Sequence, residues 1–148
     1  MSSSSARSLS SSPTSPFNVD VRPGKVPILR VEATGDAAHW ASEHRNALRA
    51  FVAEHGSLLV RGLPLRDAAE TEAVFRQLGT LMTEREAFAP RHRYAEGVYS
   101  ASKWPPNEHM CMHHELSYVL DPPELMLFAC LGAPTSGGET PVAVRIRP

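Results

Sequence analysis

The sequence predicts an α+β fold, because helical patterns come first along the chain and strand-like patterns follow. Two amphipathic segments between Asp36 and Leu78 carry apolar residues at helical spacing, and a glycine follows each of them. From Tyr94 onward, short apolar runs alternate with turns rich in proline and glycine. Helices and strands that are segregated along a chain are typical of the α+β class.

The first half of the chain contains an expected strand and an expected long helix. Residues 28–31 form a short strand after an extended lead-in that starts at Phe17. The helix has Thr34 or Asp36 as its N-cap and Gly56 as its stop. The apolar residues that repeat on one face of this helix are Trp40, Ala47, Leu48, Phe51 and Val52.

A second strand and a second helix are expected next. Residues 57–60 form a short apolar strand that runs into the turn at 61–64. The helix extends from roughly Ala68 to Leu78 and stops at Gly79. Its expected buried side chains are Ala69, Ala73, Val74 and Leu78.

The second half is expected to begin a β-sandwich or barrel. The strand-like segments are 97–100, 111–119 and 125–131, and the turns between and after them lie at 104–106, 121–123 and 136–138. Cys111 and Cys130 fall in these apolar stretches, where we expect them to be small buried hydrophobes. Two cysteines make no disulfide framework, so a reduced, cytoplasmic setting is expected.

The composition predicts one domain with an amino-terminal tail. The chain has 148 residues, of which 42% are apolar, and a formal net charge of −1. These values indicate neither a nucleic acid nor a membrane as a partner. The serine-rich residues 1–16 are expected to be a disordered tail, with an organelle transit peptide as the alternative, and residues 17–148 form the domain.

The stretch His113-His114-Glu115 carries the candidate chemistry. In a strand, residues two apart point to the same side, so His113 and Glu115 would face one way with backbones about 7 Å apart. An imidazole and a carboxylate at that spacing can converge on one ion. Two histidines and one carboxylate on one face of iron(II) leave positions open for an oxidant and for oxygen.

By itself this triplet is a weak signal, and two other interpretations stay open. One is a surface strand with ordinary polar side chains. The other is a zinc site made by His109 and His113, spaced as on successive turns of a helix. The pair Pro105-Pro106 just upstream and the strand-like sequence downstream disfavour a helix there.

Several further motifs follow one another in the second half. In chain order they are Trp104-Pro105-Pro106, His113-His114-Glu115-Leu116-Ser117-Tyr118, Pro122-Pro123, Leu127-Phe128-Ala129-Cys130 and Gly137-Gly138-Glu139-Thr140-Pro141. This series resembles the taurine dioxygenase-like (TauD/TfdA) superfamily, and within it the syringomycin-biosynthesis hydroxylase (SyrP-like) group. Residues 55–62 also resemble the early helix-to-strand junction of that family.

The resemblance implies a fold and a set of roles. The fold is a double-stranded β-helix, or jelly roll, of which this chain supplies the amino-terminal helices and the first strands. The implied activity is that of an Fe(II)- and 2-oxoglutarate-dependent dioxygenase, with His113 and Glu115 as iron ligands and Thr140 as a residue that binds 2-oxoglutarate. Ser117 and Tyr118 match the motif and are expected to pack around the site.

The resemblance also bears on the reaction and on the substrate. Related halogenating enzymes have a small residue where Glu115 stands, so the carboxylate favours hydroxylation. The group's substrates imply an amino acid or a carrier-tethered aminoacyl chain in secondary metabolism.

The family pattern is incomplete in this sequence. The family has a second histidine ligand and an arginine for 2-oxoglutarate further downstream, but no histidine follows His114 here, and Val144 stands where the family usually has an aspartate. We therefore expect a truncated fold whose exposed sheet edges favour self-association, and no turnover by this chain alone. The alternative is a non-catalytic fragment or degenerate relative that acts as a binding module.

Overall fold

Two helices and two small sheets make up the regular structure of the described residues. The computed structural model describes residues 17–83, 91–101, 105, 107–109 and 111–143, so the expected disordered tail at 1–16 lies outside the described residues. The α+β class is confirmed. The elements in chain order are β1 (Val19–Asp20), β2 (Ile28–Arg30), α1 (Ala37–His55), β3 (Leu59–Arg61), α2 (Ala68–Leu78), β4 (Arg93–Ala95) and β5 (Val98–Tyr99).

Helix α1 begins and ends where its sequence predicts. Asp36 is the N-cap, and its Oδ1 accepts hydrogen bonds from the backbone N–H groups of Ala38 at 2.8 Å and His39 at 3.3 Å. Gly56 ends the helix in the left-handed conformation, with φ 79°. The buried residues are Ala37, Ala41, Leu48 and Phe51. The buried face therefore starts one turn before Trp40, and only Leu48 and Phe51 belong to the apolar face expected from the sequence.

Replacing Asp36 with alanine is expected to destabilise the protein by about 0.5–2 kcal/mol, because two backbone N–H groups of the first turn lose their acceptor. Chemical unfolding monitored by helical circular dichroism measures the change. Asp36→Asn is the matched control, since its side-chain oxygen keeps the cap. Equal loss in both variants would contradict a capping role.

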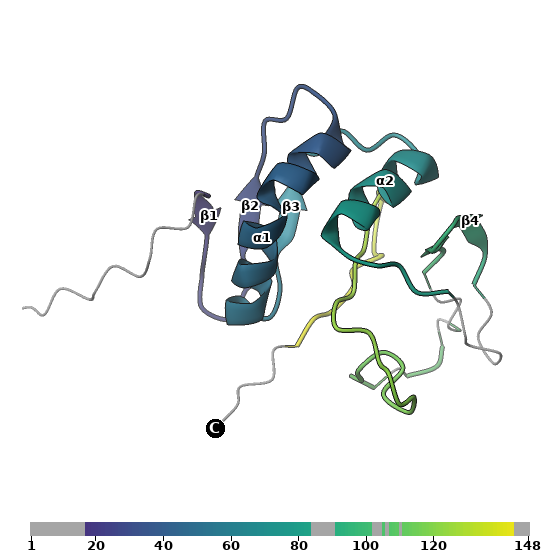
Figure 1. Cartoon of the computed structure of the whole chain (residues 1–148). Helices are drawn as coiled ribbons and strands as arrows, with labels where there is room; N and C mark the ends of the chain where they lie inside the picture. Colours follow the sequence, from purple (N-terminus) through teal and green to yellow (C-terminus); the bar gives the residue numbers. More distant parts are fainter. Residues whose placement is uncertain (1–16, 84–90, 102–104, 106, 110, 144–148) are drawn as a thin grey trace, which may run out of the picture.

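Helix α2 has the predicted bounds, and it packs against α1 (Figure 1). Its buried residues are Thr71 and Val74, and the Thr71 hydroxyl donates a hydrogen bond to the Asp67 carbonyl at 2.8 Å. The prediction that Ala69 is buried was wrong. Thr71 lies on the buried face because its hydroxyl has an acceptor within its own helix. The cluster between the two helices consists of Ala37, Ala41 and Val74, surrounded by Ala38, Trp40, Leu63, Leu65, Phe75 and Leu78.

An ion pair stabilises the start of α2. The Arg66 side chain and backbone N–H both donate to the Glu70 carboxylate, and these hydrogen bonds lower the pKa of Glu70. A carboxyl whose pKa is lower in the folded state contributes stability above its unfolded-state pKa, and the contribution is lost as the pH falls through the folded-state pKa.

We expect Glu70→Gln to lower the melting temperature at neutral pH and not in strong acid. The change should be small, because the pair is exposed. Thermal unfolding at both pH values measures this, and equal shifts would contradict it.

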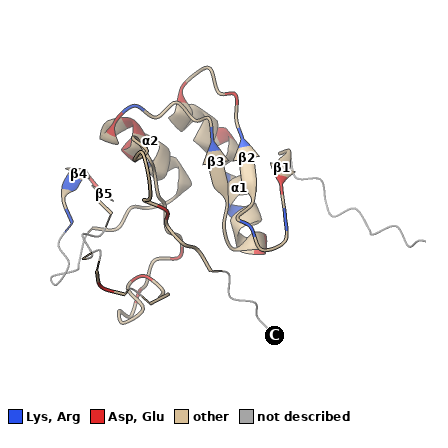
Figure 2. Ribbon diagram, turned by 180° about the vertical axis from the view of Figure 1, so that it is seen from behind, with Lys and Arg blue, Asp and Glu red and all other residues tan. Residues whose placement is uncertain are grey.

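The first sheet is three-stranded, in the order β1-β2-β3, and α1 covers one of its faces (Figure 1). Strand β2 pairs antiparallel with β1 and parallel with β3, so that Ile28 lies opposite Leu59 and Arg30 opposite Arg61. Leu29 is only 3% exposed, whereas its neighbours on β2 alternate to the other face. The strands predicted at 28–31 and 57–60 are thus confirmed to within two residues. Figure 2 shows this sheet from behind, with basic and acidic residues mixed across the molecule.

The junction after β3 depends on a glycine. Gly62 has φ 93°, and a Cβ atom built on it would lie 2.1 Å from the carbonyl oxygen of Val31. The neighbouring hydrogen bond, from the Val31 N–H to the Arg61 carbonyl at 2.8 Å, continues the pairing of β2 with β3 one residue beyond the end of β2. The backbones therefore approach here more closely than any side chain allows.

The second half contains fewer strands than the sequence predicts. Strands β4 and β5 form an antiparallel pair with an irregular register, which places a strand within the predicted segment 97–100. The predictions of strands at 111–119 and 125–131 were wrong, since the described residues after β5 contain neither helix nor strand. Leu125 and Leu127 are half-buried while Met126 and Phe128 are exposed, so the alternation of a strand is present. What is missing is a neighbouring described segment to complete the hydrogen-bond ladder.

The same lack of a covering layer exposes both cysteines. Cys111 and Cys130 are free and exposed, so the prediction that they are buried was wrong.

Neither described helix is long and apolar enough to cross a bilayer.

Candidate metal site

The Glu115 carboxylate lies at the centre of the candidate site and is held by Arg91. The Arg91 Nη2 donates to Glu115 Oε1 at 2.6 Å, and the two side chains are 17% and 18% exposed. Among the ion pairs between described residues, this is the most buried. Short, charge-assisted hydrogen bonds in such partly buried places are less screened by water than surface pairs.

His113 approaches the same carboxylate from within the motif. Its Nδ1 lies 2.8 Å from the Cys111 carbonyl oxygen. A carbonyl oxygen only accepts, so this contact assigns the ring proton to Nδ1 and leaves a lone pair on Nε2 when the ring is neutral. Nε2 in turn lies 3.8 Å from Glu115 Oε2.

His113 and Glu115 lie just before and at the start of a turn rather than in a strand. Leu116, directly after Glu115, has φ 49°, and the Val119 N–H donates to the Leu116 carbonyl at 3.1 Å. The pleat expected to align residues 113 and 115 is therefore absent, and that part of the prediction was wrong. The polar groups nevertheless face each other, and their role as ligands stays a prediction.

The donor set fits part of a metal site. Neighbouring donors on one ion, each about 2.1 Å from it, lie about 3 Å apart when their directions are perpendicular. His113 Nε2 and Glu115 Oε2 lie 3.8 Å apart, so they would have to approach each other by less than about 1 Å to reach that spacing. Within the described part of the chain, no group of three or more histidine, cysteine, aspartate or glutamate side chains could hold an ion. His113 and Glu115 are therefore a pair of candidate donors, and their role as ligands stays a prediction.

The zinc alternative is not supported by the backbone. It requires His109 and His113 to lie on successive turns of a helix, but His109 and residues 111–114 are outside any helix. His114, between the two candidate ligands, is exposed.

Comparison with known proteins assigns the chain to a family. Residues 20–143 match the family described as taurine catabolism dioxygenase TauD, TfdA family. The chain belongs to the TauD/TfdA family. The superfamily resemblance read from the motifs is confirmed, while closeness to the syringomycin group stays a prediction.

Two relatives are similar to this TauD/TfdA-family chain. A clavaminate synthase-like protein of Arabidopsis thaliana is 30% identical over 101 residues, which are 68% of this chain and 31% of the relative. The dapdiamide synthesis protein DdaC of Enterobacter agglomerans is 28% identical over 120 residues, which are 78% of this chain and 35% of the relative. The chain therefore spans about a third of the length of these relatives. No solved structure matches the chain.

Thr140, the candidate 2-oxoglutarate residue, lies in an exposed loop of this TauD/TfdA-family chain. The backbone bends at residues 135–136, and Gly137 and Gly138 follow with positive φ angles of 71° and 80°. Among the described residues, no hydrogen bond or ion pair joins Thr140 to His113 or Glu115. Ser117 and Tyr118, expected to pack around the site, are exposed, so that prediction was wrong.

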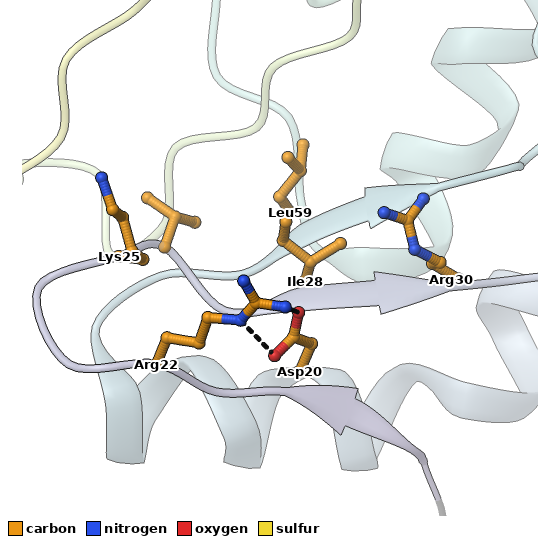
Figure 3. A pocket seen from close by; sticks show the side chains of 7 residues that line it. Asp20, Arg22, Lys25, Ile28, Arg30 and Leu59 are labelled. Atoms are coloured by element: carbon orange, nitrogen blue, oxygen red, sulfur yellow. Dashed lines mark hydrogen bonds and ion pairs between the residues drawn. The ribbon is translucent and has the colours of Figure 1, made fainter.

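Two features of the TauD/TfdA-family chain were missed by sequence reasoning. Arg91 lies 24 residues before Glu115, and no motif links the two positions. The other feature is an open hollow of about 420 Å³ on the sheet face that α1 leaves uncovered (Figure 3). Its lining residues are Asp20, Arg22, Lys25, Val26, Ile28, Arg30 and Leu59, and none of them is a candidate ligand. Its one ion pair joins Arg22 and Asp20 at 2.8 Å.

Proposed function

We propose that this chain is the amino-terminal part of an Fe(II)- and 2-oxoglutarate-dependent dioxygenase with a jelly-roll fold that hydroxylates a small molecule. Family membership supports the reaction class. The observation that carries the assignment to particular residues is the facing pair of donors, the free lone pair on His113 Nε2 and Glu115 Oε2, 3.8 Å apart.

Each side chain has a distinct part in this proposal. His113 supplies a neutral nitrogen donor whose orientation is set by the Cys111 carbonyl. Glu115 supplies a negative oxygen donor that offsets the charge of the ion. The Thr140 hydroxyl donates to a carboxylate oxygen of 2-oxoglutarate, and the Gly-Gly turn before it lets the backbone approach that ligand. Iron(II) with bound 2-oxoglutarate supplies the chemistry that activates oxygen.

The presence of a carboxylate at position 115 favours hydroxylation over halogenation, because the side chain fills the place that a halide would need on the metal. For the substrate we propose an amino acid or a carrier-tethered aminoacyl group of secondary metabolism. The names of the two relatives refer to small molecules, clavaminate and dapdiamide, which supports a small-molecule substrate.

An anaerobic titration tests the proposal. Fe(II) added to the chain with 2-oxoglutarate is expected to give a weak visible chelate band that is absent when 2-oxoglutarate is omitted. Thr140→Ala should raise the 2-oxoglutarate concentration needed for half of the band and leave metal binding unchanged, since it removes a donor to the ligand alone. A chain that gives no band and binds no metal under these conditions would contradict the proposal.

A second candidate function, a binding module without catalysis, is favoured by the exposed apolar surface of the second half. The large exposed apolar side chains among the described residues after β5 are Met112, Tyr118, Leu120, Met126, Phe128, Leu131 and Val142. Apolar surface of this extent on unpaired extended segments favours association with another chain or with a second copy. Sedimentation velocity should show concentration-dependent self-association that Phe128→Ser weakens, whereas a monomer at every concentration would argue against self-association.

A further inference from the structure

We infer that Arg91 is a positioning residue for the metal site: it holds one oxygen of Glu115 and thereby turns the other toward His113. The inference rests on the proposed function, because it assigns a role within the same site. No motif in the sequence singles out Arg91, and the assignment comes from its contact with Glu115.

The two oxygens of the carboxylate have different neighbours. Oε1 lies 2.6 Å from Arg91 Nη2, whereas Oε2 lies 3.8 Å from His113 Nε2. The terminal torsion of a glutamate has a broad minimum, so a free carboxylate would present its oxygens in many directions. A charge-assisted hydrogen bond to one oxygen restricts that rotation and keeps the other oxygen available to an ion.

The partial burial of the pair adds to this effect. Arg91 and Glu115 are 17% and 18% exposed, while His113 is 53% exposed. The carboxylate is therefore anchored on its less exposed side, and its second oxygen points toward the more open histidine. An ion arriving from solvent would meet His113 and the free oxygen without displacing Arg91.

A competing role for Arg91 predicts the opposite change in metal affinity when the residue is replaced. If the guanidinium occupied the place of the ion, or repelled it by charge, removing Arg91 would tighten metal binding. If Arg91 positions Glu115, removing it weakens binding, as removal of outer partners of ligating carboxylates does, by about 10- to 100-fold. The direction of the change therefore separates the two roles.

Calorimetric titration with Co²⁺, a redox-stable stand-in for Fe(II), tests the inference on the full chain. Arg91→Gln is expected to bind about 10- to 100-fold more weakly than wild type, and Arg91→Lys, which keeps one charged donor, should recover part of the loss. Arg76→Gln is the matched control, because Arg76 also pairs with glutamates but on the exposed face of α2. Unchanged or tighter binding by Arg91→Gln would overturn the inference.

A double-mutant cycle separates failure of this inference from failure of the proposed function. Thermal unfolding of metal-free Arg91→Gln, Glu115→Gln and the double variant is expected to show non-additive shifts, with the double variant destabilised by less than the sum of the two single ones. Additive shifts would overturn the inference whatever the titration shows. A wild-type chain that binds no metal, with non-additive shifts in the cycle, would overturn the proposed function and leave the Arg91–Glu115 contact supported.

Discussion

Replacing His113 with alanine is expected to lower the affinity of the chain for a divalent metal by at least about 100-fold, because one of two described protein donors is lost. The Glu115 oxygen would then be the one candidate donor left among the described residues. Calorimetric titration of the metal-free chain with Co²⁺ measures the affinity, and circular dichroism checks that the variant is folded. Glu115→Gln should cause a similar loss, since it keeps the shape of the side chain but removes its charge.

The chain offers a close control for this experiment. His114 is adjacent to His113 and exposed, and among the described residues no ion pair joins it to Glu115. His114→Ala is therefore expected to bind metal as the wild type does. If His114→Ala lost binding while His113→Ala kept it, the assignment of the ligand nitrogen would be wrong.

Gly62→Ala is expected to destabilise the protein by about 2–4 kcal/mol, the largest effect on folding that we predict. Alanine is strained at φ 93°, and its Cβ would lie 2.1 Å from the Val31 carbonyl oxygen. The backbone segments at Val31 and Gly62 would therefore have to move apart. That movement would also weaken the hydrogen bond from the Val31 N–H to the Arg61 carbonyl. Urea unfolding with fluorescence or circular dichroism gives the change in the free energy of unfolding.

A second glycine provides the control for Gly62. Gly35 has an ordinary φ and open space around its Cα, with nothing within 4 Å of a built Cβ. Gly35→Ala should therefore change stability by less than about 0.5 kcal/mol. If both alanine variants were equally stable, the close approach at the end of β3 would not be a feature of the folded protein.

The helices could be predicted from the sequence because their determinants are local. Asp36 and Gly56 mark the ends of α1, and Gly79 marks the end of α2, through contacts within a few residues. The exact buried face of α1 was less well predicted, since it depends on how α1 meets α2. In α2, Ala69 shows the same limit. An alanine fits the buried or the exposed face of a helix, and the tertiary contact decides between them.

The strands of the second half could not be predicted from local sequence in the same way. Leu125 to Phe128 has the alternation of a strand, but a strand also needs a neighbour that donates and accepts its hydrogen bonds. The exposure of Cys111 and Cys130 has the same cause, because apolar context predicts burial only where a second layer covers it.

By itself, the sequence determined the family, the α+β class, the ends of the helices and the choice of His113 and Glu115 as candidate ligands, since all of these depend on residue types at short spacings. The tertiary structure decided that the two side chains face each other outside any strand, and that Arg91 holds the carboxylate from 24 residues away. An ion pair between distant positions has no periodicity or motif, so only the folded backbone can bring its members together.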